Sequence, residues 1–145
     1  MREVKRSALV ALPQERVYAL INDIESYPKF VPGCSRARVE ARSESEIIAT
    51  LGVGRGRMHT EFTTRNELEP SHRIHMYLVR GPFRMLEGEW RLTPIEPGGC
   101  RIDLKVRFAF ANPFSGIIFE PLFQETVSSL VDAFVERARE LRATP

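Results

Sequence analysis

The sequence predicts an α+β fold in which a curved antiparallel sheet of about seven strands wraps around one long C-terminal helix. Three observations predict it. Apolar residues recur at helical spacing from Phe123 to Leu141, period-two alternation dominates residues 37–110, and short turns join the alternating segments. A sheet of this kind needs one partner layer for its apolar face, and the C-terminal helix is long enough to supply that layer.

The N-terminal segments supply one strand and one short helix. A first strand is expected over residues 4–11, bounded by Pro13. Pro13 and Glu15 stand where a helix start favours proline and an acid, and the helix that follows ends before Tyr27. Residues 26–33 then hold two prolines, a glycine and two aromatics, which predicts a stiff connection that includes one helical turn.

Six further strands follow from the alternation of apolar and polar residues. They are expected at residues 37–42, 47–53, 58–64, 74–78, 83–93 and 100–110, with turns at 44–45, 54–56, 69–71, 81–82 and 97–99. Apolar residues change parity between Met85 and Leu86, which predicts a β-bulge there. So many hairpin-linked strands twist enough for the sheet to curl.

The C-terminal helix has an ambiguous start. Asn112 and Pro113 suit an N-cap and a first helical residue, but Pro121 interrupts the pattern. In one straight helix Glu120 would lie on the buried stripe, so we expect a break near Glu120, with residues 112–119 folded separately. The apolar residues of that segment would then form a lip across the open end of a cavity: Phe114, Ile117, Ile118 and Phe119.

Composition fits one domain over residues 1–145, with 43% hydrophobic and 28% charged residues. No apolar run approaches the ~20 residues of a membrane span, and the charged N-terminus lacks a signal region, so a cytoplasmic location is expected. Cys34 and Cys100 lack the spacing of a zinc site or disulfide framework. A net charge of +2 gives no reason to expect a DNA partner.

The inward face of the predicted sheet is rich in small side chains: Ala37, Ala41, Ala49, Gly52, Thr60, Thr64 and Gly88. Either the helix presses directly on them in a tightly packed core, or they leave a cavity lined by apolar side chains and a few hydroxyls. Both alternatives remain open at this stage. A cavity of this kind would suit an apolar ligand.

Candidate chemistry is sparse, and we expect no enzymatic activity, no metal and no cofactor. No nucleophile motif or metal-ligand spacing occurs, and the glycine-rich residues 52–56 join two strands instead of preceding a helix. The acid, base or amide candidates for a cavity are Glu120, Gln124, Asp23 and His75. Gln124 could alternatively orient a ligand carbonyl by hydrogen bonding.

Basic residues occupy the outward parity of several strands: Arg36, Arg38, Arg42, Arg55, Arg57, Arg101, Lys105 and Arg107. Acids such as Glu40, Glu61 and Asp103 alternate with them. This pattern indicates a solvated sheet face, with a docking surface for RNA or an anionic membrane as the alternative.

Five segments together resemble the coenzyme-Q-binding START-domain family. They are Arg6-Ser7-Ala8, Tyr27-Pro28-Lys29-Phe30-Val31-Pro32, Gly81-Pro82-Phe83, Leu86-x-Gly88-x-Trp90 and Leu130-Val131-Asp132-Ala133-Phe134. The family belongs to the helix-grip (START-like, Bet v 1-like) superfamily and includes bacterial ribosome association toxins and older oligoketide or polyketide cyclases. The resemblance covers essentially the whole chain, although Gly33 stands where the family usually has tryptophan.

The resemblance implies that the chain binds an isoprenoid quinone or a similar apolar molecule in the grip cavity and supports respiration without catalysis. Interference with ribosomal subunit association and a polyketide cyclase activity are the alternatives, and transient contact with the inner membrane would suit a lipid carrier. We expect the ligand-binding residues on the loop, the inward strand faces and the helix stripe: Tyr27, Phe30, Val31, Leu51, Met58, Thr60, Phe62, Met76, Leu78, Phe83, Trp90, Phe108, Phe123, Gln124, Val127, Leu130, Val131 and Phe134.

Overall fold

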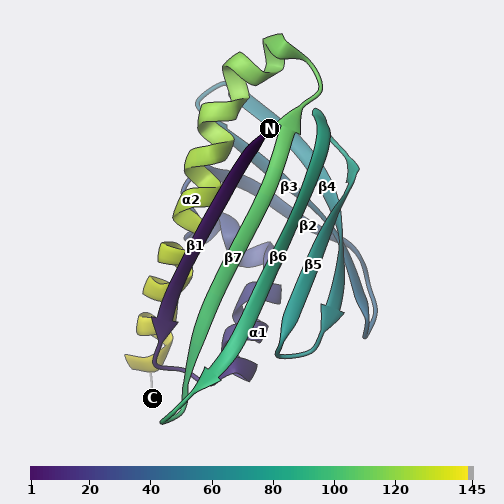
Figure 1. Ribbon diagram of the computed structural model, residues 1–145. Helices are drawn as coiled ribbons and strands as arrows, with labels where there is room; N and C mark the ends of the chain where they lie inside the picture. Colours follow the sequence, from purple (N-terminus) through teal and green to yellow (C-terminus); the bar gives the residue numbers. More distant parts are fainter. Residues whose placement is uncertain (144–145) are drawn as a thin grey trace.

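Seven strands form one antiparallel sheet in the computed structural model, which describes residues 1–143 (Figure 1). The strands are β1 Arg2–Val10, β2 Cys34–Arg42, β3 Glu46–Arg55, β4 Met58–Glu69, β5 Arg73–Arg80, β6 Phe83–Ile95 and β7 Gly99–Phe110. The helices are α1 Gln14–Asn22, the 3-10 helix η1 Ile24–Lys29 and α2 Pro113–Ala143. The strand order β1-β7-β6-β5-β4-β3-β2 and the long C-terminal helix confirm the predicted fold class.

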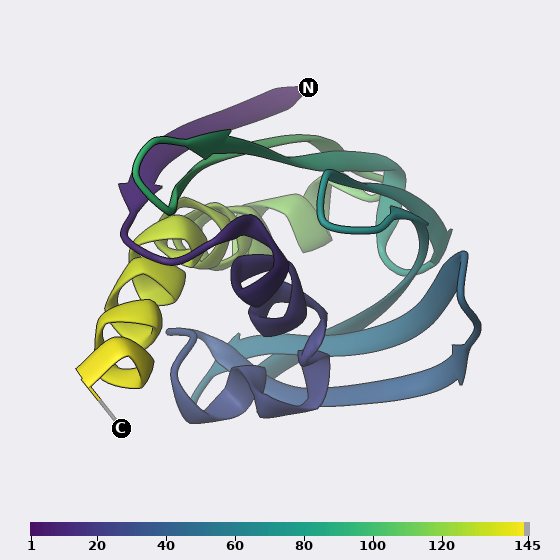
Figure 2. The ribbon, with the colours of Figure 1, turned by 90° about the horizontal axis from the view of Figure 1, so that it is seen from below.

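The sheet curls around α2, α1 lies in the space between the two arms of the curl, and η1 lies beside β2 (Figure 2). The predicted helix stripe forms the inner layer of the core, where Val131 and Phe134 are 1% and 0% exposed. From the sheet, Ile47 and Phe108 are equally buried. The apolar spacing of the C-terminal segment therefore predicted its buried face correctly.

Strand register confirms the predicted bulge and corrects part of the inward list. The β6–β7 pairing shifts between Phe83 and Met85, which is the bulge. Gly52 was expected inward but lies on the outer face, where a Cβ atom would be 3.1 Å from Cβ of Arg36. Ala41 is exposed near the end of edge strand β2, because the register shifts between Val39 and Ala41.

The expected break at Glu120 is wrong, because α2 is one helix of 31 residues with Pro121 inside it. The predicted start is confirmed, since the Asn112 side-chain oxygen accepts a hydrogen bond from the backbone N–H of Phe114 at 2.8 Å. The first turns lean away from the axis of the remaining helix (Figure 1), as expected where a proline removes one backbone donor. Within residues 1–143, no helix is long and apolar enough to cross a membrane.

Glu120 is not an unpaired buried carboxylate, which was the reason for predicting the break. Its carboxylate lies 2.7 Å from Nε of Arg2 on β1, and its side chain is 29% exposed. The predicted lip is wrong as well, because Phe114 and Ile117 are 71% and 77% exposed and line no part of the cavity described below. A helix bent at Pro121 thus carries its first turns beyond the end of the cavity.

Candidate functional site

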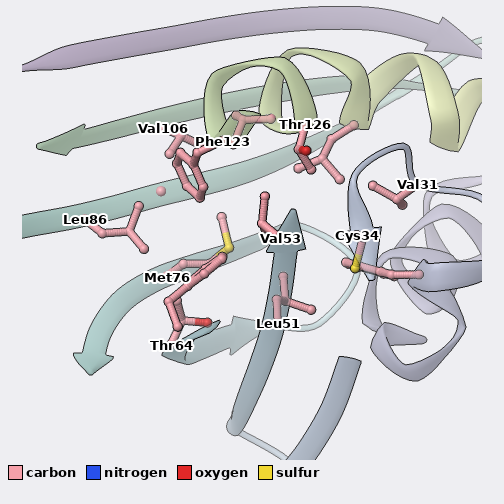
Figure 3. Close-up of a pocket in the computed structure, with 15 residues that line it drawn as sticks. Val31, Cys34, Leu51, Val53, Thr64, Met76, Leu86, Val106, Phe123 and Thr126 are labelled. Carbon is pink, nitrogen blue, oxygen red and sulfur yellow. The ribbon is translucent and has the colours of Figure 1, made fainter. Parts of the chain in front are cut away.

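A cavity of about 70 Å³ lies between the concave face of the sheet and α2 (Figure 3). Three parts of the fold contribute to its lining: Tyr27 and Val31 from η1 and the loop after it, Cys34, Leu51, Val53, Phe62, Thr64, Met76, Leu86, Gly88 and Val106 from the sheet, and Phe123, Thr126, Val127 and Leu130 from α2. Figure 3 shows Leu51, Val53 and Met76 facing Phe123 and Thr126 across this space. The structure therefore favours the cavity over the tightly packed core.

Two aromatic clusters bound the cavity along the direction of α2. We call Phe62, Phe83, Phe108, Phe110 and Phe123 the upper cluster, and Tyr27, Phe30, Trp90 and Phe134 the lower cluster. Between them the sheet presents small side chains, of which Thr64 and Gly88 line the cavity. A Cβ atom at Gly88 would lie 2.5 Å from Cε of Met76, so this flexible side chain occupies part of the space that glycine leaves.

Most polar groups in the lining are already paired within the protein. The Tyr27 hydroxyl donates to the carbonyl oxygen of Ile21, and the Thr64 hydroxyl donates to Oδ1 of Asn66 at 2.8 Å. The Thr126 hydroxyl has no hydrogen-bond partner within residues 1–143, although Thr126 is only 7% exposed. This hydroxyl faces Gly33 on the loop after η1, however, and the surface of the cavity itself is wholly apolar.

Burial suppresses ionisation in the lining. It raises the pKa of the Cys34 thiol to about 11, and it also raises the pKa of the Tyr27 phenol. Among the described residues, the lining contains no carboxylate, imidazole, lysine or arginine. At neutral pH the cavity thus offers no charged group to a bound molecule.

Alkylation of Cys34 by iodoacetamide is expected to be slow in the native protein. The thiolate is the reactive form, and raising the pKa from 9.0 to about 11 leaves about a hundredfold less thiolate at neutral pH. The rate should therefore keep rising with pH up to about 11. Mass spectrometry of native and urea-unfolded protein measures this, and equal rates in the two states would contradict the buried position.

The structure brings together these predicted site residues around the cavity: Tyr27, Val31, Leu51, Phe62, Met76, Phe123, Val127 and Leu130. The other predicted residues lie outside its lining: Phe30, Met58, Thr60, Leu78, Phe83, Trp90, Phe108, Gln124, Val131 and Phe134. Whether any of these residues contacts a ligand stays a prediction.

Three reasons explain why these predicted residues lie outside the lining. The aromatic clusters hold five of them in ring–ring contacts: Phe30, Phe83, Trp90, Phe108 and Phe134. For example, the ring centroids of Trp90 and Phe134 are 5.4 Å apart. Met58, Thr60 and Leu78 lie toward the hairpin ends of their strands, and Met58 is 43% exposed. On α2, Val131 packs in the core, while Gln124 is half-buried at the flank.

Sequence reasoning missed part of the lining: Cys34, Val53, Thr64, Leu86, Gly88, Val106 and Thr126. The signal was present, because the strand residues share the inward parity already assigned to their neighbours. Thr126 also lies three residues after Phe123 and four before Leu130, which places it on the same helix face. Thr64 and Gly88 were assigned to the inward face but not to the ligand-binding residues, and the apolar Val53, Leu86 and Val106 were left out of that set as well.

The acid, base and amide candidates lie away from the cavity. Asp23 accepts a hydrogen bond from the Ser26 hydroxyl at 2.7 Å, and Glu120 pairs with Arg2. His75 lies with Nε2 at 2.9 Å from Glu87 and stacks on Tyr77. None of these groups, nor Gln124, is part of the cavity lining.

The cavity is too small for a quinone ring in this state of the protein. Its ~70 Å³ is about half of the ~150 Å³ apolar cavity that holds benzene in another protein, and ligand pockets typically span roughly 300–1,000 Å³. The loop after η1 closes it tightly, because a Cβ atom at Gly33 would lie 2.2 Å from the Thr126 hydroxyl oxygen. A larger ligand therefore needs the lining to move, and the contact of Gly33 with Thr126 and the flexible side chain of Met76 are two places where it can.

The outward basic residues are largely paired with acids on the sheet surface. Arg36 lies 3.1 Å from Glu61, Arg38 lies 3.3 Å from Glu40, and Arg101 lies 3.1 Å from Asp103. Such exposed pairs add little stability, but they neutralise much of the positive field. The charge pattern is therefore that of a mixed solvated face.

Comparison with known proteins gives a consistent family and fold. The family model described as "Polyketide cyclase / dehydrase and lipid transport" matches residues 10–135. The ribosome association toxin RatA of Vibrio cholerae is 38% identical, over 97% of this chain and 98% of its own. RatA of Pseudomonas aeruginosa is 39% identical, over 95% of this chain and 96% of its own.

More distant relatives and solved structures extend this picture. The mitochondrial coenzyme Q-binding protein COQ10 homolog B of Xenopus laevis is 27% identical over 94% of this chain, which spans 57% of that protein. The crystal structure of TTHA0849 from Thermus thermophilus matches with a TM-score of 0.82 and 25% identity, over 99% of this chain and 100% of that one. The Streptomyces aromatase/cyclase Zhui has the same TM-score at 19% identity, over 98% and 96% of the two chains, which shows a shared fold.

Proposed function

Because the chain belongs to the polyketide cyclase/dehydrase and lipid transport family, with its helix-grip fold, we propose that it binds an isoprenoid quinone in the cavity between sheet and α2 without catalysing a reaction. The family resemblance inferred from the sequence is thereby confirmed, while the ligand is our proposal. As a carrier of this kind, the protein would support respiration by holding the quinone away from water.

The lining of the cavity is the observation that supports this proposal most. It offers apolar side chains and, within residues 1–143, no charged group for acid–base chemistry. The Thr126 hydroxyl, which has no hydrogen-bond partner within residues 1–143, would become a donor for a quinone carbonyl oxygen once the Gly33 loop moves away from it. The COQ10 relatives, named as coenzyme Q-binding proteins, support the same ligand class.

Opening the cavity has an energetic cost that an isoprenoid ligand can offset. Each methylene-sized group that leaves water contributes about 0.8 kcal/mol, so one five-carbon unit contributes about 4 kcal/mol. Separating the loop from α2 exposes a few apolar side chains, such as Val31, to water, and each methylene-sized group exposed costs a similar amount of free energy. When the loop separates from α2, apolar contacts between them are lost. The apolar surface of the proposed ligand would make new contacts with the same side chains.

Native mass spectrometry combined with organic extraction tests the proposal. The protein is produced in a quinone-synthesising host, and the mass of the intact complex and the extracted lipids are compared. We expect a fraction of the protein to carry one quinone molecule, identified in the extract. Only ligand-free protein, together with no binding of added short-chain ubiquinone, would contradict the proposal.

Hydrogen exchange in residues 27–34 is expected to slow when ubiquinone is added. This segment carries Tyr27, Val31 and Cys34 of the lining, and it must open to admit a ligand and close over it afterwards. Exchange of α1 serves as the internal control and should not change. Unchanged exchange in residues 27–34 at saturating ubiquinone would exclude this loop as the gate.

A second candidate function is binding to a ribosomal subunit, and the identity of 38–39% to proteins named ribosome association toxin favours it. The outward strand faces would carry this function, and the cavity would play no part. Sedimentation with isolated small and large ribosomal subunits tests it. Binding that is lost in Arg38→Glu with Arg107→Glu, but retained when the cavity is filled, would support this second function.

A further inference from the structure

Large exposed apolar side chains are concentrated at one end of the molecule. Met1, Phe114 and Ile117 are 72%, 71% and 77% exposed. The start of β1, the end of β7, the start of β6 and the first turns of α2 all lie at this end (Figure 1). We call Met1, Phe114 and Ile117 the apolar end. The β3–β4 and β5–β6 hairpins point the same way and add Met58 and Val79, at 43% and 47% exposure.

Among the described residues, one arginine without an ion-pair partner lies beside these apolar side chains. One surface hollow of about 390 Å³ is lined by Met1 and Ile117 together with Arg2 and Arg84. Arg2 is paired with Glu120, but Arg84 has no ion-pair partner within residues 1–143. The positive end of the α2 dipole lies at the same place.

We infer that the apolar end docks on the surface of an anionic phospholipid bilayer. Apolar side chains that project from a helix end, with cationic groups beside them, match the interfacial region of such a bilayer, where hydrocarbon and phosphate lie a few ångströms apart. Phe114 and Ile117 would enter the acyl boundary, and Arg84 would contact lipid phosphates.

The interior connects this end to the cavity by packed aromatic rings. A Cβ atom at Gly116 would lie 3.5 Å from Cβ of Phe110, and the Phe110 ring lies 4.6 Å from that of Phe83. The Phe83 ring is 4.9 Å from that of Phe123, which lines the cavity. If the proposed function holds, docking would place this upper cluster between the bilayer and the ligand site.

Flotation with vesicles of phosphatidylcholine, with and without phosphatidylglycerol, tests the docking surface. The vesicles contain no quinone, so the result is independent of ligand binding. We expect binding to the anionic vesicles only. It should fall by roughly tenfold or more in Phe114→Ser with Ile117→Ser, since both side chains lose their burial in the acyl boundary. Arg84→Glu should weaken it by about fivefold or more.

The opposite end of the molecule provides a matched control. Leu9 is 66% exposed near the end of β1, and Arg16 is an exposed arginine on α1. Leu9→Ser with Arg16→Glu should bind anionic vesicles as the wild type does. Docking at the apolar end would be overturned by wild-type protein that does not float, or by equal losses in the control and test variants. A Phe114 and Ile117 variant that keeps vesicle binding but loses self-association or ribosome binding would also overturn it.

Discussion

Replacement of Val127 by tryptophan is expected to abolish quinone binding while the protein remains folded. Val127 is 4% exposed and lines the cavity from the middle of α2, so an indole at this position would occupy the space that the ligand needs. Overpacking of this kind typically costs ~1–3 kcal/mol, which a domain of this size tolerates. Titration with short-chain ubiquinone, combined with thermal unfolding, measures both effects.

Asp132→Trp is the control for Val127→Trp. It adds the same side chain to an exposed position of the same helix, so it should leave binding and stability close to those of the wild type. If the folded Val127→Trp variant bound ubiquinone as tightly as Asp132→Trp does, the ligand would have to bind outside the cavity.

Truncation of Phe134 to alanine is expected to lower the free energy of unfolding by about 3–5 kcal/mol. The Phe134 ring is 0% exposed and packs against Tyr27 at 5.3 Å, Phe30 at 5.3 Å and Trp90 at 5.4 Å. It therefore joins α2, the loop after η1 and the sheet at one point. Urea unfolding followed by the fluorescence of Trp90, the single tryptophan, measures the loss.

Phe114→Ala is the counterpart on the same helix. Phe114 is 71% exposed, so its truncation should change the free energy of unfolding by less than about 0.5 kcal/mol. A Phe134→Ala variant as stable as Phe114→Ala would mean that the lower cluster does not hold the helix against the sheet.

The strands could be predicted because each obeys a local rule. In β7 the apolar residues Ile102, Leu104, Val106 and Phe108 alternate without interruption, and all four are buried. The covered face of a half-buried strand must show this period, whatever the rest of the fold does. The order of β2 to β7 follows from the short turns, which force neighbouring segments to pair, whereas the pairing of β1 with β7 was not predicted.

The helix break was predicted wrongly because its cause is not local. Pro121 and Glu120 each argue against a continuous helix when α2 is considered alone. The structure offsets the second cost with Arg2, which lies 118 residues earlier in the chain. Sequence spacing within the helix carries no information about this partner on β1.

The cavity could be predicted in kind but not in position. Alternation assigned both Leu51 and Trp90 to the inward face, yet Leu51 lines the cavity and Trp90 packs beside Phe134. Which level along the sheet stays empty depends on where aromatic rings from distant segments meet. The alternation within a strand cannot predict this level, because it determines which face of the sheet a side chain is on and not its position along the sheet.

Intermolecular nuclear Overhauser effects between short-chain ubiquinone and the methyl groups of the protein test the central claim most directly. The account predicts contacts from the quinone to Leu51, Val106 and Leu130, which line the cavity from the sheet and from α2. Val79 and Leu9, which are exposed, provide the comparison. Contacts confined to exposed methyl groups such as those of Val79, Leu9 and Ile117, with none to the cavity lining, would contradict it.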